Sequence, residues 1–153
     1  MERRVRPAAK ALIIRDGKLL AIKLKDDDGV MYIMPGGGQM PGELLPEAVR
    51  REVAEETGLS VTVNDVGFVI EGAQVERHHR VDIVFDCETD GETDAGRVPD
   101  QNQIGYEWLD ISVLNTLPLY PSRLRRAIMD RYEGKQRSVY LGNENMGDPE
   151  ITD

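Results

Sequence analysis

Three glutamates lie close together near the middle of the chain, at positions 52, 55 and 56. The segment around them begins with Pro46 and is followed by Gly58, residues typical of the start and the end of a helix. Residues three and four apart share one face of a helix, so Glu52, Glu55 and Glu56 are expected to form a carboxylate cluster. Such a cluster indicates either a site for a hard cation such as Mg²⁺ or a solvated acidic face.

An arginine and a fourth glutamate accompany this cluster. Arg51 lies beside the acidic face and can hold a carboxylate in a fixed orientation. Glu43 comes before the helix, within reach of Arg51. Further upstream, the glycines at 36–38 let the backbone approach a metal ion or a phosphate closely.

The complete segment from Gly37 to Leu59 resembles the Nudix box. That motif is a glycine, five residues, a glutamate, seven residues, and then Arg-Glu-aliphatic-any-Glu-Glu-any-Gly-aliphatic. This chain matches it without departure at Gly37, Glu43, Arg51, Glu52, Val53, Glu55, Glu56, Gly58 and Leu59.

The resemblance implies a Mg²⁺-dependent hydrolase, with Mn²⁺ as a substitute, that cleaves a pyrophosphate bond in a nucleoside di- or triphosphate derivative. In Nudix hydrolases the box helix presents metal to a diphosphate, and water attacks phosphorus. Carried over by position, the expected metal ligands are Glu55, Glu56, Glu52 and the carbonyl of Gly36, and Glu52 is alternatively the base. By the same comparison with the family, Glu43 and Arg51 are expected to act in catalysis by holding the carboxylate cluster in shape. Gly37 and Gly38 are expected to contact the substrate.

Family members often add a carboxylate from a loop ahead of the strand that here contains Trp108. In this chain the loop reads Asp100-Gln101-Asn102-Gln103, so Asp100 is the candidate for this extra carboxylate. The sequence leaves open which residue is the general base. Subfamily markers for ADP-ribose and for diadenosine polyphosphates, a proline and a tyrosine, are absent from 74–77.

A small cationic patch is the other candidate for substrate binding. Arg77, His79 and Arg80 are predicted to bind a phosphate, and a solvated loop that enters a strand is the alternative. The aromatic residues Tyr32, Phe85 and Trp108 lie in strand-like runs, where core packing is favoured over base stacking.

Alternating strands and helices must position these residues. Strands are expected in a hairpin over Ala8–Lys25, which turns at Asp16-Gly17, and at Val30–Met34, Val61–Ile70, His79–Cys87 and Ile104–Leu109. Helices are expected from Pro46 to Thr57 and from Ser122 to Tyr132, with a mobile loop over Glu88–Gln103. This order predicts the α/β class, with a mixed central sheet and helices on both faces. The resemblance implies a Nudix-type α/β/α sandwich. The domain is expected over 1–133 and a partly disordered tail over 134–153.

Composition narrows the functional classes. The 153-residue chain has a net charge of −9 and no long basic run, which makes nucleic acid an unlikely partner. One cysteine, Cys87, and no apolar segment of membrane-spanning length lead us to expect a cytoplasmic protein. The Nudix resemblance implies a small nucleotide as its substrate. The sequence leaves open whether the chain forms a homodimer. The alternative functions are a Nudix-fold sensor that binds a nucleotide without cutting it, and removal of pyrophosphate from RNA 5′ ends.

Overall fold

The computed structural model describes residues 4–74, 79–92, 103–135 and 138–150, and within them the chain forms an eight-stranded mixed sheet. The strands are β1 (Val5–Arg15), β2 (Lys18–Asp26), β3 (Gly29–Ile33), β4 (Gly36–Gly38), β5 (Leu59–Gly72), β6 (His79–Glu92), β7 (Gln103–Asp110) and β8 (Tyr140–Asn143). Their main order is β3-β2-β1-β6-β5-β8, with β4 paired to β1 and β7 paired to β2.

Strand β1 is the centre of the sheet. It runs antiparallel to β2 and β4 and parallel to β6. The turn from β1 to β2 has Asp16 at φ 53° and Gly17 at φ 75°, the positive angles expected of this dipeptide. Side chains alternate along β1, so Ala9 and Ala11 face one side of the sheet and Leu12 faces the other.

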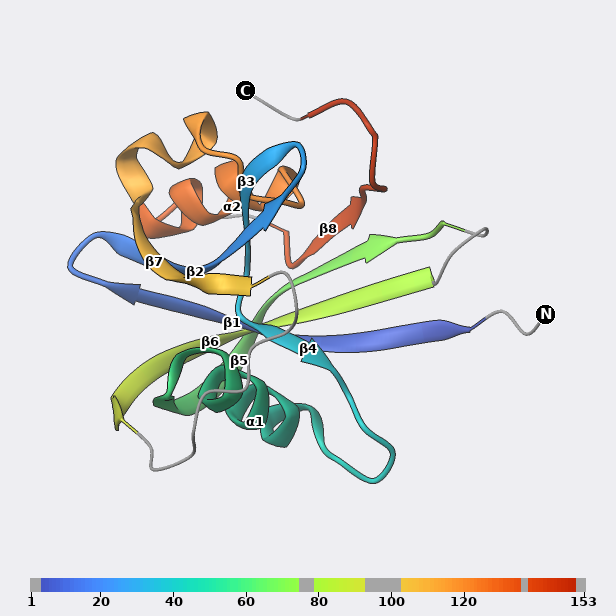
Figure 1. Ribbon diagram of the computed structural model, residues 1–153, viewed down its shortest axis with the longest axis vertical. Coiled ribbons are helices and arrows are strands. Elements are labelled where there is room, and N and C mark those ends of the chain that lie inside the picture. Colours follow the sequence, from blue (N-terminus) through green and yellow to red (C-terminus); the bar gives the residue numbers. More distant parts are fainter. Residues whose placement is uncertain (1–3, 75–78, 93–102, 136–137, 151–153) are drawn as a thin grey trace.

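Helix α1 (Leu45–Thr57) covers the first of these sides (Figure 1). Its apolar residues Ala48, Val49 and Val53 are fully buried against Ala9, Ala11 and Phe85. The helix ends as predicted at Gly58, which adopts φ 75° and donates its N–H to Ala54 O at 2.9 Å.

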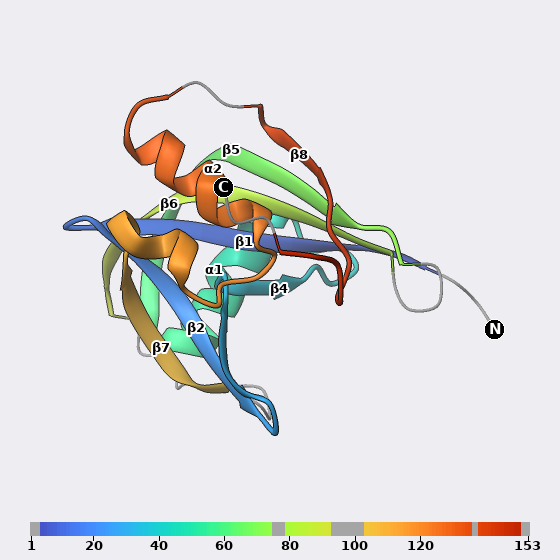
Figure 2. The same ribbon diagram turned by 90° about the horizontal axis from the view of Figure 1, so that it is seen from above.

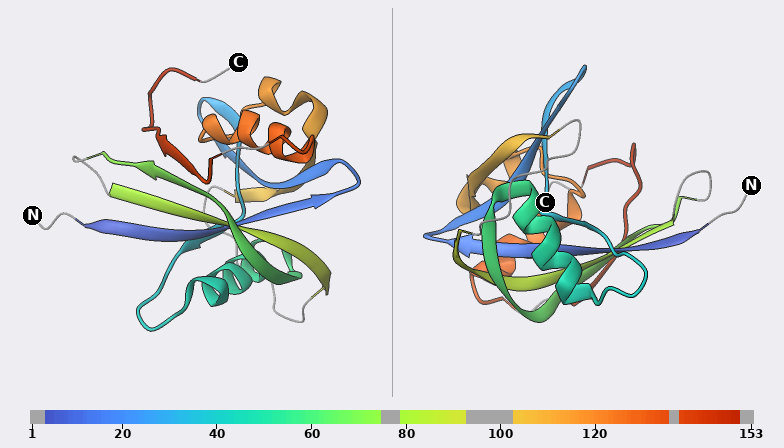
Figure 3. Two further views of the ribbon diagram at one scale, coloured as in Figure 1. Left: turned by 180° about the vertical axis from the view of Figure 1, so that it is seen from behind. Right: turned by 60° about the horizontal axis from the view of Figure 1, so that its bottom comes forward.

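Helix α2 (Arg123–Tyr132) and the short 3₁₀ helix η1 (Ile111–Thr116) lie on the opposite side (Figures 1 and 2). Leu124, Ala127 and Ile128 of α2 pack on a core that includes Leu12 and Phe68. The view from behind shows the sheet between α1 and α2 (Figure 3). The prediction of an α/β/α sandwich with a mixed sheet is therefore confirmed. No helix in the described part of the chain is long and apolar enough to span a membrane.

Two segments differ from the sequence-based expectation. Strands occupy both ends of the stretch predicted as a loop, Glu88–Gln103, because β6 continues to Glu92 and β7 begins at Gln103. Strand β6 is extended because β5 starts at Leu59 and pairs with it there. Residues 93–102 lie outside the described residues.

The second difference lies in 134–153, the stretch set apart as a tail. Its strand β8 pairs in parallel with β5, with Tyr140 opposite Val69 and Asn143 opposite Glu71. Glu144 follows and is buried at the start of α2, where it accepts hydrogen bonds from the backbone N–H groups of Ser122 and Arg123. The described part of this stretch thus packs on the sheet and on α2.

Candidate active site

Strand β4 lies directly against the acidic face of α1. The N–H of Gly36 donates to Glu56 Oε1 at 2.8 Å. At Gly36, which has φ 130°, a Cβ would lie 2.2 Å from the carbonyl oxygen of Ala9. At Gly37 a Cβ would lie 2.6 Å from Cδ of Glu52, so only glycine permits this approach of backbone to carboxylate.

Arg51 organises the carboxylates on this face. Its Nε and Nη2 donate to the two carboxylate oxygens of Glu43, at 2.7 and 2.9 Å. Its Nη1 donates to Glu52 Oε1 at 2.9 Å and lies 3.6 Å from Glu55 Oε2. Nη2 also donates to the carbonyl of Gly38 at 3.1 Å. One guanidinium therefore links the loop before α1, the helix and strand β4.

This network holds Glu43 in its charged form. Hydrogen bonds from Arg51, and then from the N–H of Met40, lower the pKa of Glu43 to about 2. The same contact with Glu43 raises the pKa of Arg51 above its ordinary value, although burial acts in the opposite direction. Glu43 and Arg51 thus form a permanent ion pair beside the cluster.

Glu56 has a different environment, because it is only 4% exposed. Burial raises its pKa to about 7, and the charge of Glu52 adds to this rise. Hydrogen bonds from Gly36 N–H and from Gln103 Nε2, the latter at 2.8 Å, oppose it, as does the positive charge of Lys10. These opposing contacts are together weaker than the effect of burial, so the pKa of Glu56 stays above its ordinary value.

Glu55 and Glu52 are more accessible than Glu56. The side chain of Glu55 is 37% exposed and that of Glu52 is 18% exposed. The cluster therefore offers one buried carboxylate, one held by Arg51 and one open to solvent.

These groups suit Mg²⁺ by chemistry. In the described part of the chain, no three His, Cys, Asp or Glu side chains form a ready-made metal cage. Mg²⁺ does not require one, because it usually binds through one or two carboxylates, water and substrate phosphates. The buried Glu56 carboxylate and the glycine backbone against Glu52 are the features that fit a small hard cation.

The cationic residues predicted to bind the substrate do not all lie in one place. Arg80 lines a cavity on the α2 side of the sheet. His79 does not line it, and instead its Nε2 lies 2.8 Å from Glu71 Oε1. Arg77 and Asp100 lie outside the described residues.

Gln103 is a contact that the sequence did not assign. It is the first residue of β7, and its amide reaches Glu56 across a separation of 47 residues. The glutamine-rich stretch before Trp108 is the signal that could have directed attention to it.

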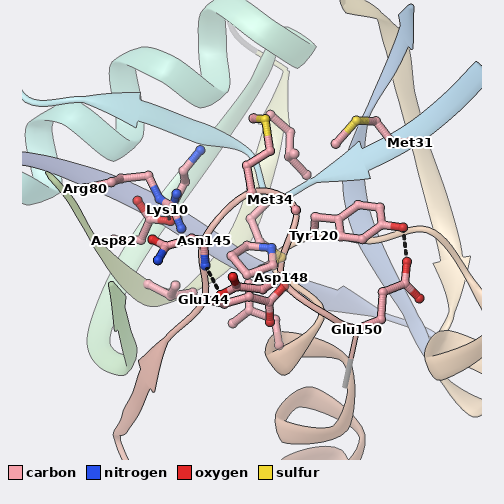
Figure 4. A pocket seen from close by; sticks show the side chains of 16 residues that line it. Lys10, Met31, Met34, Arg80, Asp82, Tyr120, Glu144, Asn145, Asp148 and Glu150 are labelled. Atoms are coloured by element: carbon pink, nitrogen blue, oxygen red, sulfur yellow. Dashed lines mark hydrogen bonds and ion pairs between the residues drawn. The ribbon is translucent and has the colours of Figure 1, made fainter. Parts of the chain in front are cut away.

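The cavity on the α2 side has a volume of about 510 Å³. Residues of β1, β6, the start of α2 and the segment 144–150 line it (Figure 4). Lys10 connects it to the cluster, because Lys10 lines the cavity, is the β1 partner of Gly36, and acts electrostatically on Glu56.

Residues 4–131 match the NUDIX domain model, so the chain belongs to the Nudix family. A similar relative is the nucleoside triphosphatase NudI of Salmonella agona strain SL483, which is 36% identical in an alignment of 90 residues that covers 50% of this chain and 63% of that protein. The chain thus matches less than two thirds of that relative's length.

Solved structures show the same fold. The MutT protein of Methanosarcina mazei Go1 is 26% identical, with a TM-score of 0.67 over 88% of this chain and 99% of that one. The E. coli ORF135 protein, at 21% identity, has a TM-score of 0.71 over 89% of this chain and 96% of that one.

Proposed function

We propose that this chain is a Mg²⁺-dependent hydrolase that cleaves a pyrophosphate bond in a nucleoside di- or triphosphate derivative, with Mn²⁺ as a substitute. The observation that carries the proposal is the carboxylate face of α1, ordered by Arg51 and packed against the glycine strand β4. Similarity to a nucleoside triphosphatase favours a triphosphate among these substrates.

Such a reaction demands little covalent chemistry from the protein. Hydrolysis of a phosphoric anhydride is driven mainly by positioning and by neutralisation of charge on the phosphates. A bound Mg²⁺ supplies that neutralisation and increases the acidity of the attacking water. Glu52, Glu55, Glu56 and the carbonyl of Gly36 are the groups that would hold the cation.

The remaining residues act by orientation. Arg51 fixes Glu52 against Gly37, so that Glu52 can serve as a further ligand or as the group that orients water and accepts its proton. Gln103 and Gly36 N–H hold Glu56 from two sides. The backbone of Gly37 and Gly38 is proposed to approach the phosphates, and Arg80 to contact the substrate from the cavity.

The partner and the location follow from the same proposal. A small nucleotide is the proposed substrate, and the net charge of −9 disfavours nucleic acid. A cytoplasmic location and a homodimer stay predictions.

The test is a panel of nucleoside triphosphates, nucleoside diphosphate derivatives and 5′-triphosphorylated RNA, assayed with Mg²⁺ or Mn²⁺. We expect metal-dependent release of pyrophosphate, phosphate or a nucleoside monophosphate from at least one nucleotide. Nucleotide binding without turnover under either metal would support the sensor instead. Turnover of the 5′-triphosphorylated RNA alone would support the alternative function, removal of pyrophosphate from RNA 5′ ends.

A further inference from the structure

The cavity of about 510 Å³ differs in character between its two ends. Figure 4 shows Lys10, Arg80, Asp82 and Asn145 gathered at one end, here called the polar end, and Met31 at the other end with Tyr120, whose hydroxyl donates to Glu150. An apolar pocket with a few placed polar groups is the usual form of a site for a small organic ligand. The polar end therefore decides which ligand fits.

Asp82 is the most unusual group at this end. Its residue is only 3% exposed, and Arg80 Nε donates to its Oδ2 at 2.8 Å. Within the described part of the chain, its Oδ1 is buried with no hydrogen-bond partner. Buried polar atoms are nearly always paired, so an unpaired carboxylate oxygen in a cavity wall indicates a missing donor.

A second acceptor in the same wall is also unpaired. Asn145 lines the cavity, and its Oδ1 is buried with no partner among the described residues. The backbone around it is fixed, because Asn145 N–H donates to Asp148 Oδ2 at 2.7 Å and the preceding Glu144 binds the start of α2. Two unpaired acceptors in one wall suit a donor group that carries two N–H hydrogens.

An exocyclic amino group of a nucleobase has these hydrogens. A base that presents a carbonyl oxygen at the same position would place its lone pairs against the two acceptors. Lys10 connects the cavity with the carboxylate cluster, because it lines the cavity and its positive charge acts electrostatically on Glu56. Phosphates attached to a base in the cavity can extend toward Lys10, which acts on both sites.

We propose that this cavity binds the substrate base and that Asp82, oriented by Arg80, selects bases that carry an exocyclic amino group. The proposal rests on the proposed function, because it takes the substrate to be a nucleotide. Asp82 is thereby a specificity-determining residue, and the segment 144–150, beyond the family match, supplies its partner Asn145.

The first measurement is the affinity of the metal-free protein for matched nucleoside monophosphates, by titration calorimetry. CMP is compared with UMP, and AMP with IMP, since each pair exchanges an amino group for a carbonyl. A hydrogen bond to a charged group predicts that the amino member of at least one pair binds at least about tenfold more tightly. Equal affinities in both pairs, or no binding of any of the four, would overturn the proposal.

The second measurement uses Asp82→Asn. Arg80 Nε must still find an acceptor, so it holds the amide oxygen and turns the amide N–H₂ toward the position of the unpaired Oδ1. The acceptor becomes a donor, and the preference for the amino member should disappear or invert. Asp90→Asn, at an exposed position of the same strand where the carboxylate accepts from Thr62, makes the same charge change outside the cavity and should keep the wild-type ratio.

The two proposals fail separately. Selective binding of nucleotides whose base carries an amino group, without hydrolysis of any nucleotide, would contradict the proposed function and would still support the role of Asp82. Hydrolysis with no preference between amino and carbonyl bases, and an unchanged ratio in Asp82→Asn, would contradict the role of Asp82 alone.

Discussion

Glu55 and Glu56 are the residues on which the proposed metal site depends most directly. Replacement of either by glutamine removes a charge and keeps the shape, so Gly36 N–H can still donate to the amide oxygen at position 56. We expect each variant to lower kcat by at least about a hundredfold, because a lost metal ligand removes charge neutralisation in the transition state. The measurement is turnover of the best nucleotide at saturating Mg²⁺.

Glu47→Gln is the matched control for these variants. Glu47 lies in the first turn of the same helix, where its carboxylate accepts from Leu44 N–H, away from the cluster. It should retain nearly the full rate. Near-normal turnover by Glu55→Gln or Glu56→Gln would place the metal elsewhere.

Arg51 should affect activity through the cluster and not through the substrate. Its removal frees Glu43 and Glu52 from the contacts that fix them. We therefore expect Arg51→Ala to weaken the apparent affinity for Mg²⁺, measured as the metal dependence of kcat. Arg51→Lys should recover little, because an ammonium group cannot form the two-point contact with Glu43. A change confined to the KM of the nucleotide would instead make Arg51 a substrate ligand.

At the residue scale, the sequence predicted the contacts that depend on local spacing. Glu52, Glu55 and Arg51 share one helical segment, and the period of a helix is enough to bring them together. The contact of Gln103 with Glu56 and the unpaired oxygen of Asp82 depend on how distant strands meet. Neither leaves a periodic pattern in the sequence.

Among the elements, the start of α2 depends on a residue far along the chain. Glu144 accepts from Ser122 N–H at 2.7 Å, from Ser122 Oγ and from Arg123 N–H at 3.0 Å, all at the helix N-terminus. Glu144→Ala removes the carboxylate that accepts from these donors at the largely buried start of α2, so we expect the free energy of unfolding to fall by about 1–3 kcal/mol. Urea denaturation measures this change.

Glu133→Ala is the control for this variant. Glu133 follows the other end of α2 and is exposed, and its ion pair with Lys135 should contribute less than about 1 kcal/mol. Equal stability of Glu144→Ala and wild type would mean that the contacts of Glu144 do not stabilise the start of α2.

The contrast between α1 and β8 explains which elements the sequence could predict. Helix α1 has its end signal, Gly58, inside its own segment, and its observed bounds agree with the prediction to within one residue. Strand β8 has four residues and gains its place by pairing with β5, some 70 residues away along the chain. A short apolar run at 139–141 carries too little pattern to reveal that partner.

For the whole molecule, the carboxylate cluster makes stability depend on metal. The chain has a net charge of −9, and the folded state brings Glu52, Glu55 and Glu56 onto one helix face. A cation that binds only the folded form stabilises it by mass action. We expect Mg²⁺ to raise the Tm of the wild type relative to EDTA, and to raise that of Glu56→Gln much less.

The pH dependence of unfolding in EDTA tests the origin of this effect. Burial raises the pKa of Glu56 from 4.5 to about 7, so the metal-free folded state holds this proton more tightly than the unfolded state does. The stability that the proton contributes is complete below about pH 4.5 and is lost as pH rises through about 7. Glu56→Gln does not titrate, so between about pH 5 and pH 8 the wild type should lose more stability than the variant, by on the order of 3 kcal/mol at most.

Urea denaturation of both proteins across this pH range, with EDTA and with saturating Mg²⁺, gives the four curves needed. With Mg²⁺ the difference in slope should shrink, because a bound cation stabilises the charged carboxylate in the folded state. In EDTA above about pH 7, Glu56→Gln should therefore be at least as stable as the wild type, while its turnover is nearly abolished. Parallel curves in EDTA, together with no effect of Mg²⁺ on the wild type, would make the cluster a structural feature of α1 and not a metal site.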